Sequence, residues 1–294
     1  MNKTSKSEVH RRKLMKHTWL IIAAWTLILG GLLAWDLSTL KQASQNLAIG
    51  EAHTHLKEYT AFRLWASTHG GFYVPTDERT PPSPYLAHIP ERDIETPSGV
   101  QLTLMNPAYA LRQMNEEFAE TSGVAGHITS LQPLHPENAP DDWERLALES
   151  FKNGTIEVLE FTEFTGQPFL RLMQPVIAQE DCIKCHADQG YDVGDVRGGI
   201  SISLPLDAYL IEEKQAIRTH ILLFTLLWIL GFGVIIQGSR VVKQKDNKRK
   251  YAQKMSQISY DQLEIRVRER TAELARPTRD CKLRMPSVYE WRMP

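Results

Sequence analysis

Two long apolar runs limit what this chain can fold into. Residues 19–35 and residues 221–236 contain no ionisable side chain. With their uncharged neighbours, both runs approach the roughly 20 residues that an α-helix needs to cross about 30 Å of hydrocarbon. A tryptophan stands at each end of the first run, as is typical of membrane interfaces. We therefore expect two transmembrane helices, at residues 19–36 and 219–237.

Charge is divided around these runs, although the net charge of the whole chain is only −1. Residues 1–18 hold six Lys or Arg and one acidic residue, and residues 238–254 hold seven and one. Residues 36–218 hold 13 Lys or Arg against 27 Asp or Glu. Basic flanks mark the cytoplasmic ends of membrane helices. We expect both termini in the cytoplasm and the acidic middle segment in the periplasm, outside a bacterial inner membrane. A cleaved signal peptide for the first run and a buried core helix for the second are the alternatives.

The exported segment contains the motif with the most specific chemistry. Residues 182–186 read Cys-Ile-Lys-Cys-His, and C-x-x-C-H is the signature of c-type haem attachment. Two thiols three positions apart reach the two vinyl groups of one porphyrin, and His186 then becomes the proximal iron ligand. A zinc site needs further ligands, and the third cysteine, Cys281, lies in the cytoplasmic part. We therefore expect one haem c, attached covalently through Cys182 and Cys185.

The second axial ligand of the iron has several candidates. His69 is the first choice, because it ends a long helical stretch just before two glycines, where a flat cofactor can approach closely. An open or water-filled position is an alternative. The other candidates are the remaining histidines and methionines of the exported segment: His53, His55, His88, His127, His135, His220, Met105, Met114 and Met173.

Apolar spacing and turn signals predict an α+β domain at residues 37–218. Helices are expected at 37–69, from the cap Asn106 to Gly123, from Asp141 to Asn153, and at 206–218. Strands are expected at 101–104, 125–132, 155–164, 168–177 and 200–204. The proline-rich residues 75–100 are expected to form a long loop. This order is typical of a PAS-like domain, with an antiparallel sheet and flanking helices between the two transmembrane helices.

The cytoplasmic part after the second apolar run is expected to be a charged helix at residues 238–276, acting as a coiled-coil signalling linker. The a/d positions of a coiled coil are filled by Tyr260, Leu263, Val267 and Leu274. A solvated single helix is the alternative. Residues 277–294 show no periodicity and are expected to form an unstructured tail.

Several motifs of the exported segment resemble those of one bacterial family. They are Arg63-Leu-Trp-Ala, His69-Gly-Gly-Phe-Tyr-Val-Pro75, Leu102-Thr-Leu-Met-Asn-Pro-Ala-Tyr109, Gly126-His-Ile-Thr-Ser-Leu-Gln-Pro133, Gly194-Asp-Val-Arg-Gly-Gly-Ile200 and the haem motif. Together they resemble the PAS-like periplasmic c-type haem sensor domain, formerly a domain of unknown function, of bacterial sensor histidine kinases and diguanylate cyclases. The resemblance covers most of residues 50–205. It implies a haem-bearing sensory receptor in which Cys182, Cys185 and His186 hold the cofactor. Residues 263–274 resemble the coiled linker that often precedes kinase or cyclase modules.

Two functions fit these features. The first is a membrane-bound receptor that detects redox state or a small gaseous ligand in the periplasm and transmits it through two transmembrane helices. The second is a membrane-anchored electron-transfer c-type cytochrome, which needs one anchor and no cytoplasmic coil. An enzyme is not expected, because no second chemical constellation accompanies the haem motif.

The expected partners follow from the receptor hypothesis. They are inner-membrane lipid, a second copy of the chain in a homodimer, and a cytoplasmic histidine kinase or cyclase output supplied in trans. Nucleic acid is not expected. A truncated or frameshifted kinase or cyclase is the alternative explanation for a linker that no output sequence follows.

Overall fold

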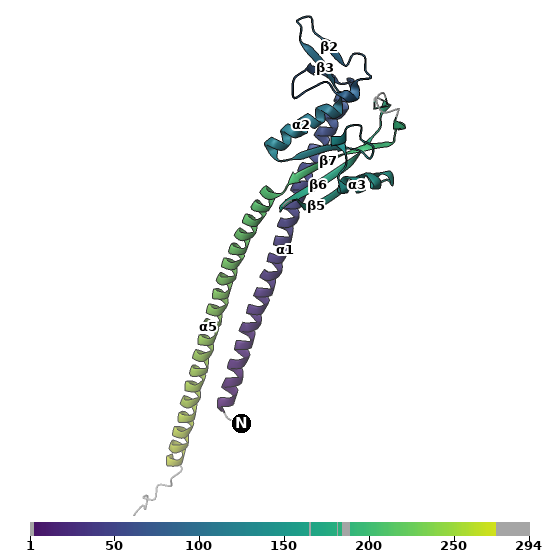
Figure 1. Cartoon of the computed structure of the whole chain (residues 1–294). Helices are drawn as coiled ribbons and strands as arrows, with labels where there is room; N and C mark the ends of the chain where they lie inside the picture. The colour runs from purple at the N-terminus through teal and green to yellow at the C-terminus, as the bar shows by residue number, and fades with distance from the viewer. Residues whose placement is uncertain (1–2, 165, 181, 184–188, 275–294) are drawn as a thin grey trace, which may run out of the picture. The chain divides into compact units, whose positions relative to one another are not determined.

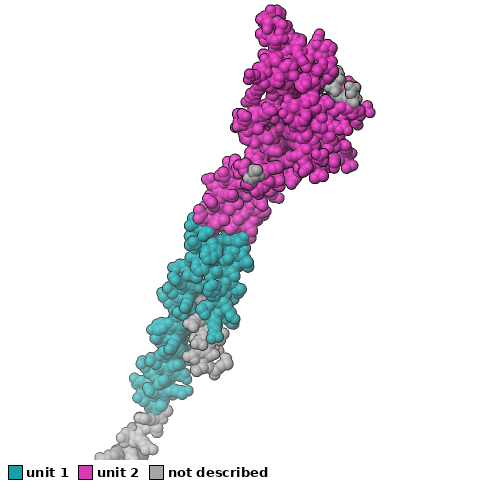
Figure 2. All heavy atoms as spheres, in the orientation of Figure 1, with its two compact units in different colours: residues 1–30, 225–294 teal, residues 31–224 magenta. Residues whose placement is uncertain are grey.

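A computed structural model describes residues 3–164, 166–180, 182–183 and 189–274. The chain divides into two compact units, one formed by residues 31–224 and one by residues 1–30 with 225–294 (Figure 2). The helices are α1 (Lys3–Thr68), α2 (Pro107–Ser122), α3 (Asp142–Lys152) and α5 (Asp207–Leu274), with 3-10 turns η1 (Pro84–Leu86) and η2 (Pro136–Asn138) (Figure 1). The strands are β1 (Phe72–Pro75), β2 (Asp93–Glu95), β3 (Gln101–Met105), β4 (Ala125–Thr129), β5 (Val158–Phe164), β6 (Gln167–Ile177) and β7 (Val196–Pro205).

The two longest helices, α1 and α5, contain the apolar runs. No proline occurs in residues 1–74 or 206–276, so no missing backbone donor interrupts either helix. Each helix is long and apolar enough, by length and composition, to cross a membrane. In the unit formed by residues 1–30 with 225–294, Trp228 Nε1 donates a hydrogen bond to Thr26 Oγ1 at 2.9 Å. The helices predicted on either side of the apolar runs are confirmed, as parts of these two continuous helices.

A four-stranded antiparallel sheet forms the centre of the other unit, with the strand order β4-β7-β6-β5. Strand β6 pairs with β7 so that Leu172 lies opposite Ile202. Successive side chains of a strand point to opposite faces, and the middle of β6 is buried at four consecutive positions, Leu170 to Met173. Both faces of the sheet are therefore covered at its centre.

Helix α1 and helix α3 provide these two covers. On one face, Ala48, Ala52 and Leu56 of α1 pack in a cluster with Leu172 and Ile202. On the other face, Ala147, Leu148 and Phe151 of α3 pack against Met173 of β6. Small residues on α1 let the helix approach the sheet closely, and a Cβ atom at Gly126 of β4 would lie only 2.1 Å from Tyr59 of α1.

A second, smaller sheet corrects the sequence prediction of one sheet and one long loop. Strands β1, β3 and β2 form an antiparallel sheet in that order. Strand β1 includes Pro75, and β2 lies inside the proline-rich segment that was predicted to be a loop at residues 75–100. These strands have only four and three residues, too few for an alternation of apolar and polar residues to be recognised.

Helix ends follow the predicted capping chemistry. The Asn106 side chain accepts a hydrogen bond from Tyr109 N at 2.9 Å, and Gly123 ends α2 with φ of 75°. Asp141 caps α3 in a capping box with Glu144, in which each side chain accepts from the other residue's backbone N–H. The predicted helices and strands of this unit are thus confirmed to within a few residues.

Candidate functional site

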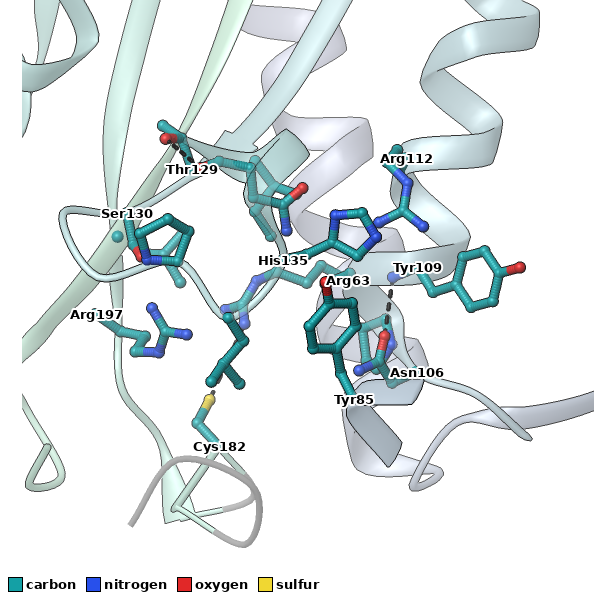
Figure 3. A pocket seen from close by; sticks show the side chains of 18 of the residues that line it. Arg63, Tyr85, Asn106, Tyr109, Arg112, Thr129, Ser130, His135, Cys182 and Arg197 are labelled. Carbon is teal, nitrogen blue, oxygen red and sulfur yellow. Dashed lines mark hydrogen bonds between the residues drawn. The ribbon is translucent and has the colours of Figure 1, made fainter. Parts of the chain in front are cut away.

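A large cavity lies inside the unit formed by residues 31–224. Its empty volume, which includes space open to solvent, is about 1180 Å³. Helix α1, turn η1, the start of α2, the end of β4, and strands β6 and β7 all contribute to its wall (Figure 3). Apolar side chains in the wall include Leu86, Ile128, Leu134 and Val176.

Two adjacent glycines of β7, Gly198 and Gly199, form part of this wall. A Cβ atom at Gly198 would lie 2.3 Å from the backbone oxygen of Thr129 on β4, a contact so short that the backbone would have to move. A Cβ atom at Gly199 would lie 2.2 Å from Cε at the flexible end of Met173 and 3.2 Å from the backbone oxygen of Gln174, both on β6. The close approach of β4 to β7 therefore accounts for Gly198 in the motif at residues 194–200.

Cys182 lines the same cavity. It is half-buried and free, and its backbone N–H donates to Gln179 O at 2.9 Å. Its Sγ lies 4.0 Å from a terminal guanidinium nitrogen (NH1) of Arg63 on α1. The other two residues of the predicted attachment motif, Cys185 and His186, lie outside the described residues. Of that motif, the structure therefore places one cysteine in the wall of this cavity.

Positive charge dominates the cavity wall. Arg63, Arg112 and Arg197 all line it, and no Asp or Glu is among its lining residues in the described part of the chain. Arg112 pairs with Glu137 at 3.2 Å and lies over the Tyr109 ring at 4.9 Å. Burial lowers the pKa of Arg197, whose guanidinium lies over the Tyr191 ring at 5.0 Å. The cavity therefore suits an anionic ligand with a large apolar body.

Two of the candidate axial ligands, His88 and His135, line the cavity. The Nδ1 atom of His135 accepts a hydrogen bond from Glu137 N at 3.3 Å. In a neutral imidazole, the other ring nitrogen, Nε2, then carries the proton. This tautomer is the wrong one for a metal bond through Nε2. His88 is exposed, at the rim formed after η1.

His69 is exposed at the end of α1, and it is not among the residues lining the cavity. Its Nδ1 donates a hydrogen bond to Trp65 O at 2.7 Å, and its ring lies 4.9 Å from that of Trp65. A backbone carbonyl that accepts from Nδ1 leaves Nε2 unprotonated, as in most metal-ligating histidines. Its tautomer is thus suitable, although the structure does not bring its side chain to Cys182. Its assignment as a ligand stays a prediction.

The remaining candidates are engaged elsewhere. His53, His55, His127 and His220 each lie within ion-pair distance of a carboxylate. Met105 and Met173 are buried in apolar clusters, and Met114 packs against the main core.

A buried charge cluster behind the cavity wall was not predicted. Glu144 of α3 is only 2% exposed, and it lies 3.0 Å from His127 Nδ1 and accepts from Ser201 Oγ at 2.6 Å. The other nitrogen of His127 donates to Glu137 O at 3.1 Å, in turn η2. The same turn η2 contains Asn138, which lines the cavity. Glu144 also takes part in the capping box with Asp141 at the start of α3, and its partners His127 and Ser201 are distant in sequence.

Burial and pairing act in opposite directions on this cluster. Burial alone lowers the pKa of His127, but the hydrogen bond and the charge of Glu144 outweigh it, and the pKa is raised. Burial alone raises the pKa of Glu144, but His127 outweighs it, and the pKa is lowered. Because both nitrogens of His127 face oxygen atoms, the geometry fits an imidazolium paired with a carboxylate.

Comparison with known proteins identifies the family. The family model described as "Tll0287-like: Tll0287" matches residues 41–205, which is more than half of the chain. A solved structure, titled "Crystal structure of the cyanobacterial heme-protein Tll0287", is 15% identical and covers 53% of this chain and 94% of that one, with a TM-score of 0.36. No curated protein sequence matches the chain. The family match, which includes α2, α3 and all seven strands, shows that this chain belongs to the Tll0287-like family.

Proposed function

We propose that this chain is a membrane-bound haem-c sensory receptor. In this proposal a PAS-like periplasmic domain, residues 37–218, detects redox state or a small gaseous ligand. Two transmembrane helices, at residues 19–36 and 219–237, transmit the change to the cytoplasm. The proposal rests on one observation above others: Cys182, the first residue of a C-x-x-C-H motif, lies against a large cavity that is lined by arginines.

The chemistry of the cavity wall fits a haem. The porphyrin body is apolar and its two propionates are anionic, matching a wall of aliphatic side chains and guanidinium groups. Cys182 and Cys185 would form the covalent links, and His186 would bind the iron. When bound, haem supplies an iron that changes oxidation state and binds small gases. Tll0287, after which the family is named, is itself described as a heme-protein.

Chain connectivity supports a sensory role. Arg63 of the cavity wall lies on α1, the same continuous helix that contains the first apolar run. Arg197 lies on β7, and only Leu206 separates β7 from α5, which contains the second apolar run. A change in the cavity wall would therefore act directly on both transmembrane helices, as a rigid element transmits a shift.

The cytoplasmic end of α5 supports a partner. The seam residues Tyr260, Leu263, Val267 and Leu274 are between 57% and 87% exposed in the single chain. Burial of such a seam against a second copy is the usual role of an a/d pattern. We propose a homodimer in the inner membrane that regulates a histidine kinase or cyclase output, rather than an enzyme or a nucleic-acid-binding protein.

An absorption spectrum tests the cofactor and the signal together. The protein extracted from membranes would be measured oxidised, reduced, and reduced with CO or NO. Rapid spectral change on adding gas indicates an open iron and a gas receptor. A six-coordinate spectrum that ignores gas indicates redox sensing, and its loss in His69→Ala but not in His88→Ala would assign His69 as the second ligand.

Cross-linking tests signal transmission. Single cysteines placed along residues 250–274, with Cys281→Ser as background, report how the two cytoplasmic helices pack in a dimer. We expect the pattern to differ between the oxidised, reduced and NO-bound protein. The same pattern in all three states would contradict the receptor and would favour a tethered electron-transfer cytochrome.

A further inference from the structure

A histidine–aspartate pair joins α1 to α5 at one end of the two apolar runs. Asp36 directly follows the first run, and His220 directly precedes the second. Nδ1 of His220 lies 2.5 Å from Oδ2 of Asp36, and the two side chains are 36% and 32% exposed. Both residues belong to the unit formed by residues 31–224. The pair therefore lies where both helices pass from the sheet-containing unit into the expected membrane spans.

The pair is electrostatically isolated. Side chains three and four positions apart are neighbours on a helix surface, and none of the positions with this spacing from Asp36 or His220 is ionisable: 32–33, 39–40, 216–217 and 223–224. The nearest charged residues along the two helices are Lys41 and Arg218. In the described part of the chain, Asp36 and His220 form an ion pair only with each other. The charge of His220 therefore decides the strength of this contact.

A second polar contact joins α1 to α5 in the same unit, and it has different chemistry. The Tyr209 hydroxyl of α5 donates a hydrogen bond to the Glu51 carboxylate of α1. Burial and the neighbouring Glu51 raise the pKa of Tyr209, so this hydroxyl stays protonated near neutral pH. Histidine, in contrast, is the side chain whose ordinary titration falls between about pH 5 and 8. Of these two contacts, only the Asp36–His220 pair can change its charge in that range.

We propose that Asp36 and His220 form a pH-sensitive contact that sets the position of α1 relative to α5 at the outer face of the membrane. A protonated His220 makes a charge-assisted hydrogen bond to Asp36, which is about twice as strong as a neutral one. Half-burial beside hydrocarbon strengthens the attraction further. Loss of the proton weakens the contact, and a local change of this kind can bias a two-state element. Periplasmic pH would thus be a second input to the receptor.

This inference goes beyond the proposed function. It uses the expected topology of the two spans but not the haem, since neither Asp36 nor His220 lines the cavity.

The test measures the distance between α1 and α5 beside the pair, in the full-length protein with its haem in lipid nanodiscs. Nitroxide labels are placed at Ser38→Cys and Gln215→Cys, two exposed positions, with Cys281→Ser as background. Labelled protein is diluted with unlabelled protein, so that double electron–electron resonance reports distances within one chain. The distance distribution is recorded between about pH 5 and 8.

The variants are His220→Gln and Asp36→Asn, each of which removes the titrating pair. His53→Gln is the matched control, because His53 pairs with Glu157 at 2.7 Å, with side chains 30% and 28% exposed, and this pair does not involve α5. Tyr209→Phe is the second control, since it removes the other polar contact between the two helices.

We expect a short, narrow distance distribution at low pH in the wild type, and a longer, broader one at high pH. His220→Gln and Asp36→Asn should lose this dependence on pH, whereas His53→Gln and Tyr209→Phe should keep it. If one of the two pair variants fails to accumulate, the other still decides between the outcomes.

A wild-type distance that does not change with pH, or a change that persists in both pair variants, would overturn this inference and leave the haem receptor intact. A wild-type protein without covalent haem would overturn the proposed function, but the distance measurement would still decide on the pair. The two failures are therefore distinguishable.

Discussion

The two compact units, residues 31–224 and residues 1–30 with 225–294, differ in how they bury large apolar side chains. In the first, Leu172 and Ile202 are fully buried between the sheet and α1. In the second, Leu227 and Leu230 of α5 are 44% and 65% exposed. Large apolar side chains exposed along a helix require another apolar environment. The core of the first unit therefore buries its own apolar side chains, whereas the exposed leucines of the second need lipid or another chain.

Charged groups show the same contrast. Glu144 is buried, but His127, Ser201 and the backbone of Asp141 satisfy it inside the domain. Along residues 240–274 of α5, charged residues form exposed pairs such as Arg268 with Glu264, which contribute little to stability. Stability of the sheet-containing unit is therefore encoded in its own contacts, whereas that of the long helices depends on their surroundings.

The largest difference in unfolding free energy should appear when one leucine of each unit is replaced by alanine. Leu172→Ala leaves a cavity in the core and should lower the free energy of unfolding by about 2–5 kcal/mol. Leu227→Ala should change it by no more than about 0.5 kcal/mol, because lipid can fill the space. Thermal or denaturant unfolding of the outer domain in detergent measures both. Equal losses would show that Leu227 packs inside the protein.

An added carboxylate should affect the second apolar run more than the surface of the sheet-containing unit. Leu227→Asp places a carboxylate near the middle of the second apolar run and should oppose membrane insertion by about 2.5–3.5 kcal/mol. Leu146→Asp, on the exposed face of α3, should leave insertion unchanged. The membrane-bound fraction after alkaline extraction reports the difference. If Leu227→Asp inserts as well as the wild type, α5 does not cross the membrane at this position.

The buried pair should make the outer domain sensitive to pH. The pKa of His127 is raised above 6.5, so its contribution is fully present below about pH 6.5 and is lost as pH rises through the folded-state pKa. The pKa of Glu144 is lowered below 4.5, so its contribution is present above about pH 4.5 and is lost as pH falls through its folded-state pKa. The pair therefore stabilises most between about pH 4.5 and 6.5.

Melting temperatures of the wild type and His127→Gln at several pH values test this dependence. The gap between them should be widest near about pH 5–6 and should narrow above about pH 7. His53→Gln, which alters the more exposed pair with Glu157, should give a smaller gap. A gap that does not vary with pH would mean that His127 is not charged in the folded protein.

The smallest effect on folding is expected at the a/d seam of residues 260–274. Leu263→Ala should change the stability of the chain by no more than about 0.5 kcal/mol, since Leu263 is 60% exposed in the single chain. It should still reduce disulfide cross-linking of Val267→Cys between two copies, whereas Arg266→Ala should not. Cross-linking unaffected by Leu263→Ala would contradict the proposed coiled coil.

Local sequence signals predicted local structure well. The apolar runs indicated α1 and α5, Asn106 and Gly123 indicated the limits of α2, and Asp141 indicated the start of α3. Each of these features depends on residues close together in the chain. The predicted cofactor motif is equally local, although Cys185 and His186 are outside the described residues.

Long-range arrangements could not be predicted in the same way. Arg63 and Arg197 come from α1 and β7, and only the folded sheet brings both to Cys182. Similarly, Glu144 meets His127 and Ser201 through the pairing of β4 with β7. The small β1-β3-β2 sheet was missed because β1 and β2 have only four and three residues, and prolines precede and follow β2. Neither the composition of the sequence nor its periodicity shows which distant residues meet in the fold.

The most direct test of the account is the mass of the purified protein after denaturation, read together with its pyridine haemochrome spectrum. The account predicts one haem that stays attached in denaturant, through two thioether bonds, and is lost or attached through a single bond in Cys182→Ala. A wild-type chain that has only its polypeptide mass, when produced in a host that attaches haem to other c-type cytochromes, would contradict the central claim.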